Sequence, residues 1–133
     1  MKPAIQITET EWEIMRVVWA HHPISSTALI ERLIAADATW HPKTARALIS
    51  RLVGKKALRY EVQGRSHVYE PLVTERESIA TASETFLERI LGGSLKPMLT
   101  YFVEQKQITK RDLEELRALL EGRTAPRKPR RKP

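Results

Sequence analysis

The chain has 133 residues, enough for one compact domain with an appendage or for two small units. It carries 23 Lys and Arg residues against 16 Asp and Glu, a net charge of +7, and it contains no cysteine. We therefore expect neither disulfides nor a thiolate zinc site. Because no apolar run approaches about 18 residues, we also expect a cytoplasmic protein without a membrane-inserted segment.

Residues 8–36 predict two helices. Thr8 and Glu11 have the spacing of a capping box, and the helix that they open should end near Pro23, because proline disfavours helix in the residue before it. Either Ser25 or Ser26 is a suitable N-cap for the second helix. Apolar residues at helical spacing give each helix a side to bury: Trp12, Met15, Val18 and Trp19 in the first, and Leu29, Ile30 and Leu33 in the second.

The segment from Pro42 to Leu52 predicts a third helix with one apolar and one basic face. Proline suits the first helical position, so we expect the helix to begin at Pro42. The apolar face holds Ala45, Leu48, Ile49 and Leu52, and the opposite face holds Lys43, Arg46, Ala47 and Ser50. Small residues between cations allow close approach to a DNA major groove, where Arg and Lys reach base edges and phosphates. The alternative is the solvated face of an ordinary amphipathic helix.

The residues that follow predict a β-hairpin, which favours the DNA-binding interpretation. Alternating runs at 58–62 and 68–70 flank a turn at 63–66 that contains Gly64. Residues 43–65 hold seven Lys and Arg and one acid, a net charge of +6. A basic helix followed by a hairpin is the winged form of the helix-turn-helix motif. The expected DNA contacts are with bases for Lys43 and Arg46, and with phosphates for Arg51, Lys55 and Arg65.

Residues 74–122 predict three further helices, with caps at Thr74 and Thr109 and a break at Gly92-Gly93. This section has a net charge of −2, so we do not expect it to bind DNA. Three helices of roughly 45 residues in all are too small to bury much apolar surface alone, so we expect them to pair with a second copy. Packing onto the first domain in a monomer is the alternative. The residues expected at the dimer interface are Phe86, Ile90, Leu95, Leu99, Phe102, Leu113, Leu116 and Leu120.

The expected fold class is thus mainly α with a small β-hairpin wing. A winged helix-turn-helix domain should occupy residues 1–73, a helical dimerisation domain residues 74–122, and a disordered basic tail residues 123–133. We expect His41 to cap or flank the basic helix, His67 to be an exposed hairpin residue, and the tryptophans Trp12, Trp19 and Trp40 to lie in the core.

Catalytic and metal sites are not expected. His21 and His22 are adjacent, so on a helix they point in different directions and rarely bind one ion together. The sequence has no glycine-rich phosphate loop, nucleophile elbow or paired-carboxylate signature. We therefore expect no enzymatic activity and no cofactor.

Several separated motifs resemble one family. The stretches 11–19 and 40–52, the pair Gly64-Arg65 and the stretch 69–73 resemble the penicillinase-repressor (BlaI/MecI/CopY) family of bacterial transcription regulators, in the same order and spacing from about residue 7 to 120. The resemblance implies an N-terminal winged helix and a three-helix dimerisation domain. It also implies a homodimer that binds a dyad operator, commonly at β-lactam resistance genes. By the same resemblance, Lys43, Thr44 and Arg46 match positions that contact the operator.

Two departures from the family pattern bear on how repression would be relieved. In the β-lactam members a membrane sensor metalloprotease signals, and the repressor is cut at an Asn-Phe bond, for which the matching pair here is Tyr101-Phe102. The copper-responsive members carry a C-terminal cysteine cluster that this chain lacks, which excludes copper sensing by that route. The alternatives to a protease-released repressor are a winged-helix protein-interaction module and a ligand-responsive regulator without proteolytic release.

Overall fold

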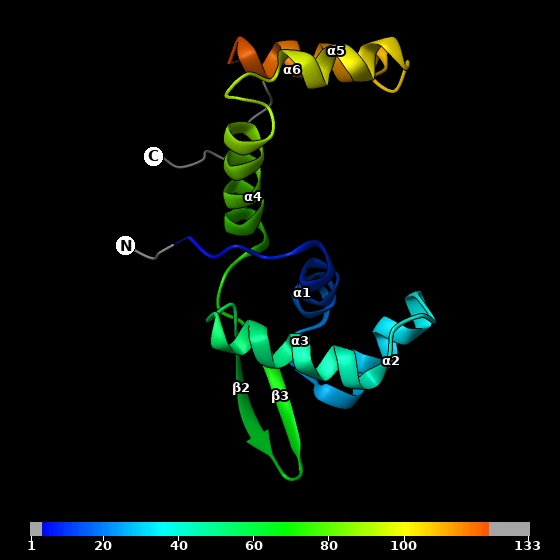
Figure 1. The fold of residues 1–133 in the computed structure, drawn as a ribbon, viewed down its shortest axis with the longest axis vertical. Helices are drawn as coiled ribbons and strands as arrows, with labels where there is room; N and C mark the ends of the chain where they lie inside the picture. The colour runs from blue at the N-terminus through cyan, green and yellow to red at the C-terminus, as the bar shows by residue number, and fades with distance from the viewer. Residues whose placement is uncertain (1–3, 123–133) are drawn as a thin grey trace. The chain divides into compact units, whose positions relative to one another are not determined.

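The computed structural model describes residues 4–122, so the predicted basic tail lies outside the described residues. The chain forms two compact units, residues 1–86 and 87–133, which are treated separately below. The elements of the first unit are α1 (Glu9–His21), β1 (Ile24–Ser25), α2 (Ser26–Ala36), α3 (Pro42–Gly54), β2 (Leu58–Gln63), β3 (Ser66–Pro71) and α4 (Glu75–Arg89) up to Phe86 (Figure 1). The sequence placed its domain boundary at residue 73, whereas α4 is grouped mostly with the first unit.

The helices of the first unit begin where local capping chemistry predicts. The Thr8 hydroxyl accepts from the Glu11 N–H and the Glu11 carboxylate accepts from the Thr8 N–H, so both arms of the predicted capping box are present. Ser25 caps α2 through its hydroxyl, which accepts from the Ala28 N–H at 3.1 Å. Pro42 opens α3 in the first turn, and His41 is its N-cap.

The sheet has three antiparallel strands in the order β1-β3-β2. The predicted hairpin is present, with Tyr60 opposite Tyr69 and Gln63 opposite Ser66 across a two-residue turn. Gly64 in that turn has a φ of +64°, a backbone conformation that residues with a Cβ rarely adopt. The two-residue strand β1 was not predicted, and it pairs Ile24 with Tyr69.

One hydrophobic core lies between α1, α2, α3 and the sheet. It buries the apolar faces that the helical periodicity predicted, except that Leu48, Trp19 and Trp40 are half-buried at its edge and half-buried Trp12 packs its ring against that of Trp19. An indole N–H needs a hydrogen-bond partner, and two of the three find one: Trp19 donates to the Val73 carbonyl and Trp40 to the Glu13 carboxylate. The core residues are Ile14, Met15, Val18, Ile24, Leu29, Ile30, Leu33, Ala45, Ile49, Leu52, Ala57, Leu58, Tyr69 and Val73.

The second unit contains α5 (Lys96–Glu104) and α6 (Lys110–Leu120). Gly92 and Gly93, both with positive φ, follow α4 as the sequence predicts. Thr109 and Asp112 form a reciprocal capping box at the start of α6, which confirms the predicted start. Neither α5 nor α6 contains a buried residue, so their apolar stripes are not covered within the described chain.

Candidate nucleic-acid interface

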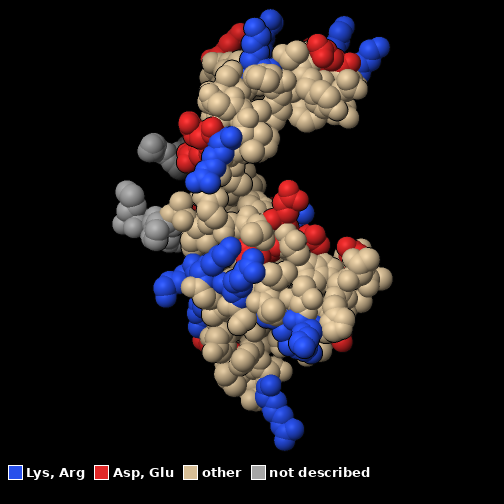
Figure 2. Space-filling view, viewed as in Figure 1, with Lys and Arg blue, Asp and Glu red and all other residues tan. Residues whose placement is uncertain are grey.

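The outer face of α3 is exposed, small and basic. Lys43, Arg46, Ala47 and Ser50 are exposed, whereas Ala45, Ile49 and Leu52 on the opposite side are buried. Thr44 is also exposed, at the flank of this face. Figure 2 shows basic side chains gathered over the surface that carries α3. The exposed face of α3 thus carries Lys43 and Arg46, the two residues predicted to contact DNA bases, together with the small residues predicted to allow close approach.

The first turn of α3 is held by its N-cap. The Nδ1 atom of His41 accepts from the Lys43 N–H at 3.1 Å, which satisfies one of the amide groups that lack a partner inside the helix. His41 thus caps the basic helix, as predicted.

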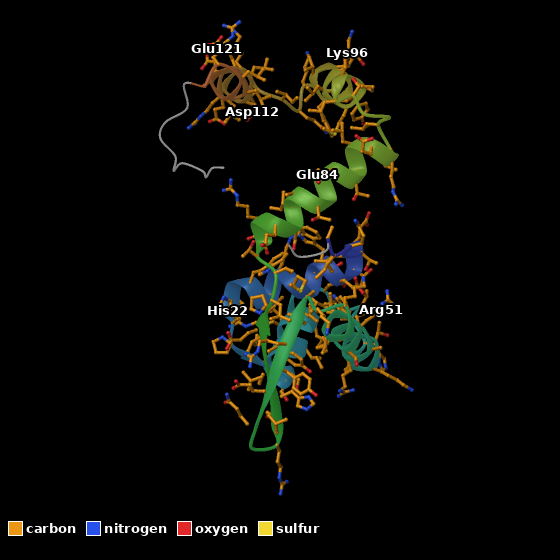
Figure 3. All side chains as sticks on the ribbon, turned by 90° about the vertical axis from the view of Figure 1, so that its left-hand side faces the viewer. His22, Arg51, Glu84, Lys96, Asp112 and Glu121 are labelled. Carbon is orange, nitrogen blue, oxygen red and sulfur yellow. The ribbon has the colours of Figure 1, made fainter. Side chains whose placement is uncertain are left out.

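The C-terminal half of α3 is tied to α1 by a buried carboxylate. Glu11 is fully buried, and its carboxylate accepts from Arg51 Nε at 3.1 Å and from Lys55 Nζ at 2.6 Å. Lys55 also donates to the Gln6 carbonyl at 2.8 Å. Arg51 and Lys55, which the sequence assigned to phosphate contacts, thus share a carboxylate partner within the chain, while their side chains stay 57% and 29% exposed (Arg51 is labelled in Figure 3).

Opposing effects act on the pKa of Glu11. Burial raises it, but hydrogen bonds from Lys55, Thr8 and Arg51 and the charge of Lys55 together outweigh burial, so the pKa lies below its ordinary value. Glu11 is ionised at neutral pH and acts as a counter-charge for the two cations. This network sets the position of α3 relative to α1, and sequence reasoning missed it because it joins residues 40 and more positions apart.

The two faces of the wing, the hairpin β2-β3, differ in charge. On its outer face, which carries Arg59, Glu61 and Glu70, Arg59 pairs with Glu61 at 2.8 Å and with Glu70 at 3.8 Å, so the charge of Arg59 is compensated. At the tip, Arg65 is exposed beside Gly64, and Figure 2 shows a basic side chain projecting from the end of the hairpin. No ion pair among the described residues involves Arg65, Lys43 or Arg46.

The inner face of the wing borders a groove of about 370 Å³ beside α3. The rings of Tyr60 and His67 lie on this side with their centroids 4.4 Å apart, and Tyr69 lies next to them. Burial raises the pKa of Tyr69, with a further contribution from Tyr60. The residues that line the groove are Ser26, Arg46, Ile49, Ser50, Val53, Tyr60, His67 and Tyr69.

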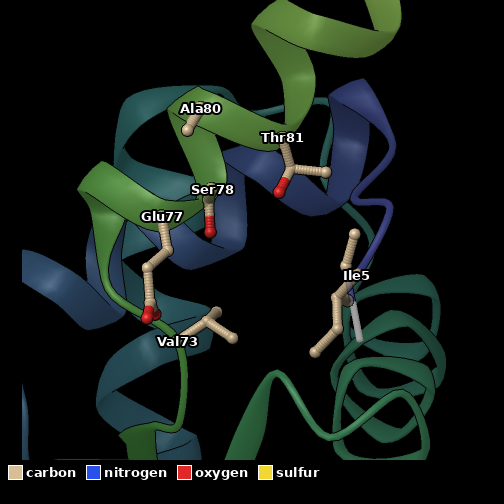
Figure 4. Close-up of a pocket in the computed structure, with 7 residues that line it drawn as sticks. Ile5, Val73, Glu77, Ser78, Ala80 and Thr81 are labelled. Atoms are coloured by element: carbon tan, nitrogen blue, oxygen red, sulfur yellow. The ribbon is translucent and has the colours of Figure 1, made fainter. Parts of the chain in front are cut away.

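A second hollow, of about 260 Å³, lies between the N-terminal segment and α4 (Figure 4). Val73, Ser78 and Thr81 are among its lining residues. It contains no set of converging charged groups. Within residues 4–122 the structure has no cluster of three or more side chains that could hold a metal ion, and none of the helices described there is long and apolar enough to cross a membrane.

The residues predicted to pair two copies lie on α4, α5, α6 and the loop between α4 and α5. Most are exposed, up to 87% for Leu120, and Phe102 is half-buried. Tyr101 is exposed on α5 with its ring 5.3 Å from that of Phe102.

Comparisons with known proteins identify the family of the chain. The model of the penicillinase repressor family matches residues 7–122. The chain belongs to this family. Its similarity extends to the penicillinase repressor of Bacillus licheniformis, with 36% identity over 91% of this chain and 94% of that protein. The methicillin resistance regulatory protein MecI of Staphylococcus aureus strain N315 is 30% identical over 86% of this chain and 93% of its own.

A solved structure matches the winged-helix part. The solution structure of the DNA-binding domain of the repressor BlaI has a TM-score of 0.52 and 38% identity to this chain, and it covers 58% of this chain and 93% of its own. The match supports the expected fold class, mainly helical with a small antiparallel sheet.

Proposed function

We propose that this penicillinase repressor family member is a homodimeric transcriptional repressor that binds a dyad DNA operator through α3 and the wing. The observation that carries the proposal is the exposed face of α3, where small residues separate cations that no acid of the described chain neutralises. A helix of this kind enters the major groove, and two-fold related copies place two such helices in successive grooves. Occupied operator DNA then excludes RNA polymerase from the promoter.

The side chains take different roles in this proposal. Lys43 and Arg46 reach base edges, because their side chains extend from the exposed face of α3. Thr44 contacts a phosphate or a thymine methyl from the flank of that face, and Ala47 and Ser50 allow the helix to approach closely. Arg65 contacts a phosphate from the wing tip. Arg51 and Lys55 serve DNA binding mainly by holding α3 through Glu11.

The decisive experiment measures affinity for a duplex selected from a randomised pool and for a scrambled duplex. We expect the unmodified chain to prefer the selected duplex by ~10³-fold or more. Arg46→Ala should weaken binding to the selected duplex by about 1–3 kcal/mol and reduce the preference. Arg76→Ala, which removes an exposed arginine from α4, is the matched control and should change neither. Equal binding of both duplexes by the unmodified chain would refute the proposal and favour a protein-interaction module.

The second unit and the end of α4 supply the dimer contact in this proposal. Apolar side chains exposed to water on three helices are energetically unfavourable in a single copy. In a symmetric dimer, the same residues of the second copy cover them. The interface is formed by Phe86, Ile90, Leu95, Leu99, Phe102, Leu113, Leu116 and Leu120.

Release from DNA follows cleavage between Tyr101 and Phe102 by a membrane-bound sensor metalloprotease. This bond lies inside α5, where the Tyr101 carbonyl accepts from the Gln105 N–H, so the helix must open locally before a protease can bind it. Mass spectrometry of the chain from cells exposed to a β-lactam tests this step. A fragment that ends at Tyr101 supports it. Loss of repression with the chain intact would support a ligand-responsive regulator instead, with the hollow in Figure 4 as the place to search for the ligand.

A further inference from the structure

The segment that precedes α1, residues 4–8, lies against both the core and α4, and we call it the N-terminal strap. Its exposure alternates, with Ile5 and Ile7 half-buried between exposed neighbours, which is the pattern of an extended segment. Ile5 and Ile7 pack against the hydrophobic core. Figure 4 shows Ile5 across the hollow from Val73 and Thr81, so the strap also borders the start of α4.

Gln6, in the middle of the strap, connects two elements that are distant from it in the sequence. Its side-chain amide donates to the Thr85 hydroxyl of α4 at 3.1 Å. Its main-chain carbonyl accepts from Lys55 Nζ at 2.8 Å, and the same ammonium group donates to the Glu11 carboxylate. Gln6 thus joins α4 to the network that holds the end of α3.

α4 is attached to the winged helix at two points. At its start, the Trp19 indole donates to the Val73 carbonyl at 2.9 Å, and Ser78 in the first turns is buried. The second point, Thr85, lies ten residues beyond Glu75, about 15 Å along the helix at 1.5 Å per residue. A helix held only at its start can swing about that point, whereas a second attachment at this distance fixes its direction.

The direction of α4 matters because the helix continues to Arg89, past residue 86, after which the second unit begins. The inference rests on the proposed function, in which the second unit joins two copies and each α3 reads one half of a dyad operator. The spacing between the two copies of α3 then decides which half-site spacing fits. We propose that the hydrogen bond between Gln6 and Thr85 determines specificity for half-site spacing. Gln6 is thus a positioning residue that acts through α4.

The first test measures the distance between the two winged helices of the dimer without DNA. The chain contains no cysteine, so Glu31→Cys on the exposed surface of α2 gives one spin-label site per copy. Gln6→Ala and Thr85→Val remove the hydrogen bond but keep the main-chain carbonyl that accepts from Lys55. Each should broaden the distance distribution measured by double electron–electron resonance. Ser83→Ala, which removes an exposed hydroxyl from α4, is the matched control and should leave the distribution unchanged.

The second test varies the spacing between the two half-sites of the selected duplex. Insertion or removal of one base pair rotates one half-site by about 35° relative to the other. The unmodified chain should bind both altered duplexes more weakly than the selected duplex. Gln6→Ala and Thr85→Val should reduce this loss about two- to tenfold, the range for a single hydrogen bond. The double variant should match either single variant, because both substitutions remove the same bond.

A duplex with a single half-site separates this role from damage to the DNA-binding face. Gln6→Ala should bind that duplex like the unmodified chain. Weaker binding would show that Gln6 acts on the winged helix itself and would overturn the inference, as would unchanged distance distributions and spacing preferences in both variants. Failure of the proposed function looks different, because the unmodified chain then gives no distance between labels or no preference for the selected duplex.

Discussion

At the scale of single residues, Glu11 combines two tasks that are usually separate. It occupies position N3 in the capping box of α1 and is the counter-charge of Arg51 and Lys55 at the end of α3. An unpaired carboxylate would be costly at a fully buried position, and the two cations with the Thr8 amide remove that cost. One side chain therefore sets both where α1 begins and where α3 lies.

We predict that Glu11→Gln lowers the free energy of unfolding by about 1–2 kcal/mol at neutral pH, measured by urea denaturation. The amide keeps the shape of the carboxylate but leaves Lys55 and Arg51 without their counter-charge. The loss is limited because both cations retain contact with water. Glu31→Gln on the exposed surface of α2 is the control and should be neutral.

Comparison of the unmodified chain with Glu11→Gln also tests how the contribution of Glu11 to stability depends on pH. The pKa of Glu11 in the folded chain lies below its ordinary value of 4.5, so its ionic contribution is fully present above pH 4.5 and is lost as the pH falls through the folded-state pKa. The stability difference between the unmodified chain and Glu11→Gln should shrink in acid. A difference that grows below pH 4.5 would contradict this role of Glu11.

At the scale of elements, the sequence predicts well what neighbouring residues decide. The capping boxes at Thr8 and Thr109, the Ser25 cap and the start of α3 at Pro42 depend on side chains within three positions of each other. β1 could not be predicted, because two residues show no alternation and Ile24 becomes a strand residue only by pairing with Tyr69. The Glu11 network and the position of His67 beside Tyr60 likewise depend on contacts made in the folded chain.

The element-scale prediction concerns the small residue on the outer face of α3. Ala47→Leu should fold with a stability within 0.5 kcal/mol of the unmodified chain, about the limit for a surface substitution, because Ala47 is exposed. It should weaken binding to the selected duplex by tenfold or more, since a larger side chain holds the helix away from base edges. Fluorescence anisotropy and thermal unfolding measure the two effects. Ala35→Leu, on the exposed side of α2, should affect neither.

At the scale of the whole molecule, the uncovered apolar side chains of α5 and α6 argue for a second copy. We predict that Leu99→Arg yields monomers at concentrations at which the unmodified chain is a dimer, measured by sedimentation equilibrium. A cation on the apolar stripe of α5 would lose its hydration in the interface without a partner. Thr100→Arg adds the same charge at the neighbouring exposed position and should leave the dimer intact. A monomeric unmodified chain would contradict the predicted interface.

Some cations on and near α3 form ion pairs with carboxylates of the same chain, and this pairing affects how strongly DNA binding depends on ionic strength. Residues 43–65 hold seven Lys and Arg, but three of them, Arg51, Lys55 and Arg59, have carboxylate partners in the folded chain. Each phosphate that a cation neutralises releases about 0.9 of a condensed counterion, so the four cations without a carboxylate partner would release at most about seven from a dimer site, whereas all seven would release about thirteen. A repressor built this way holds its operator over a wider range of salt than its sequence suggests, because part of its positive charge supports the fold.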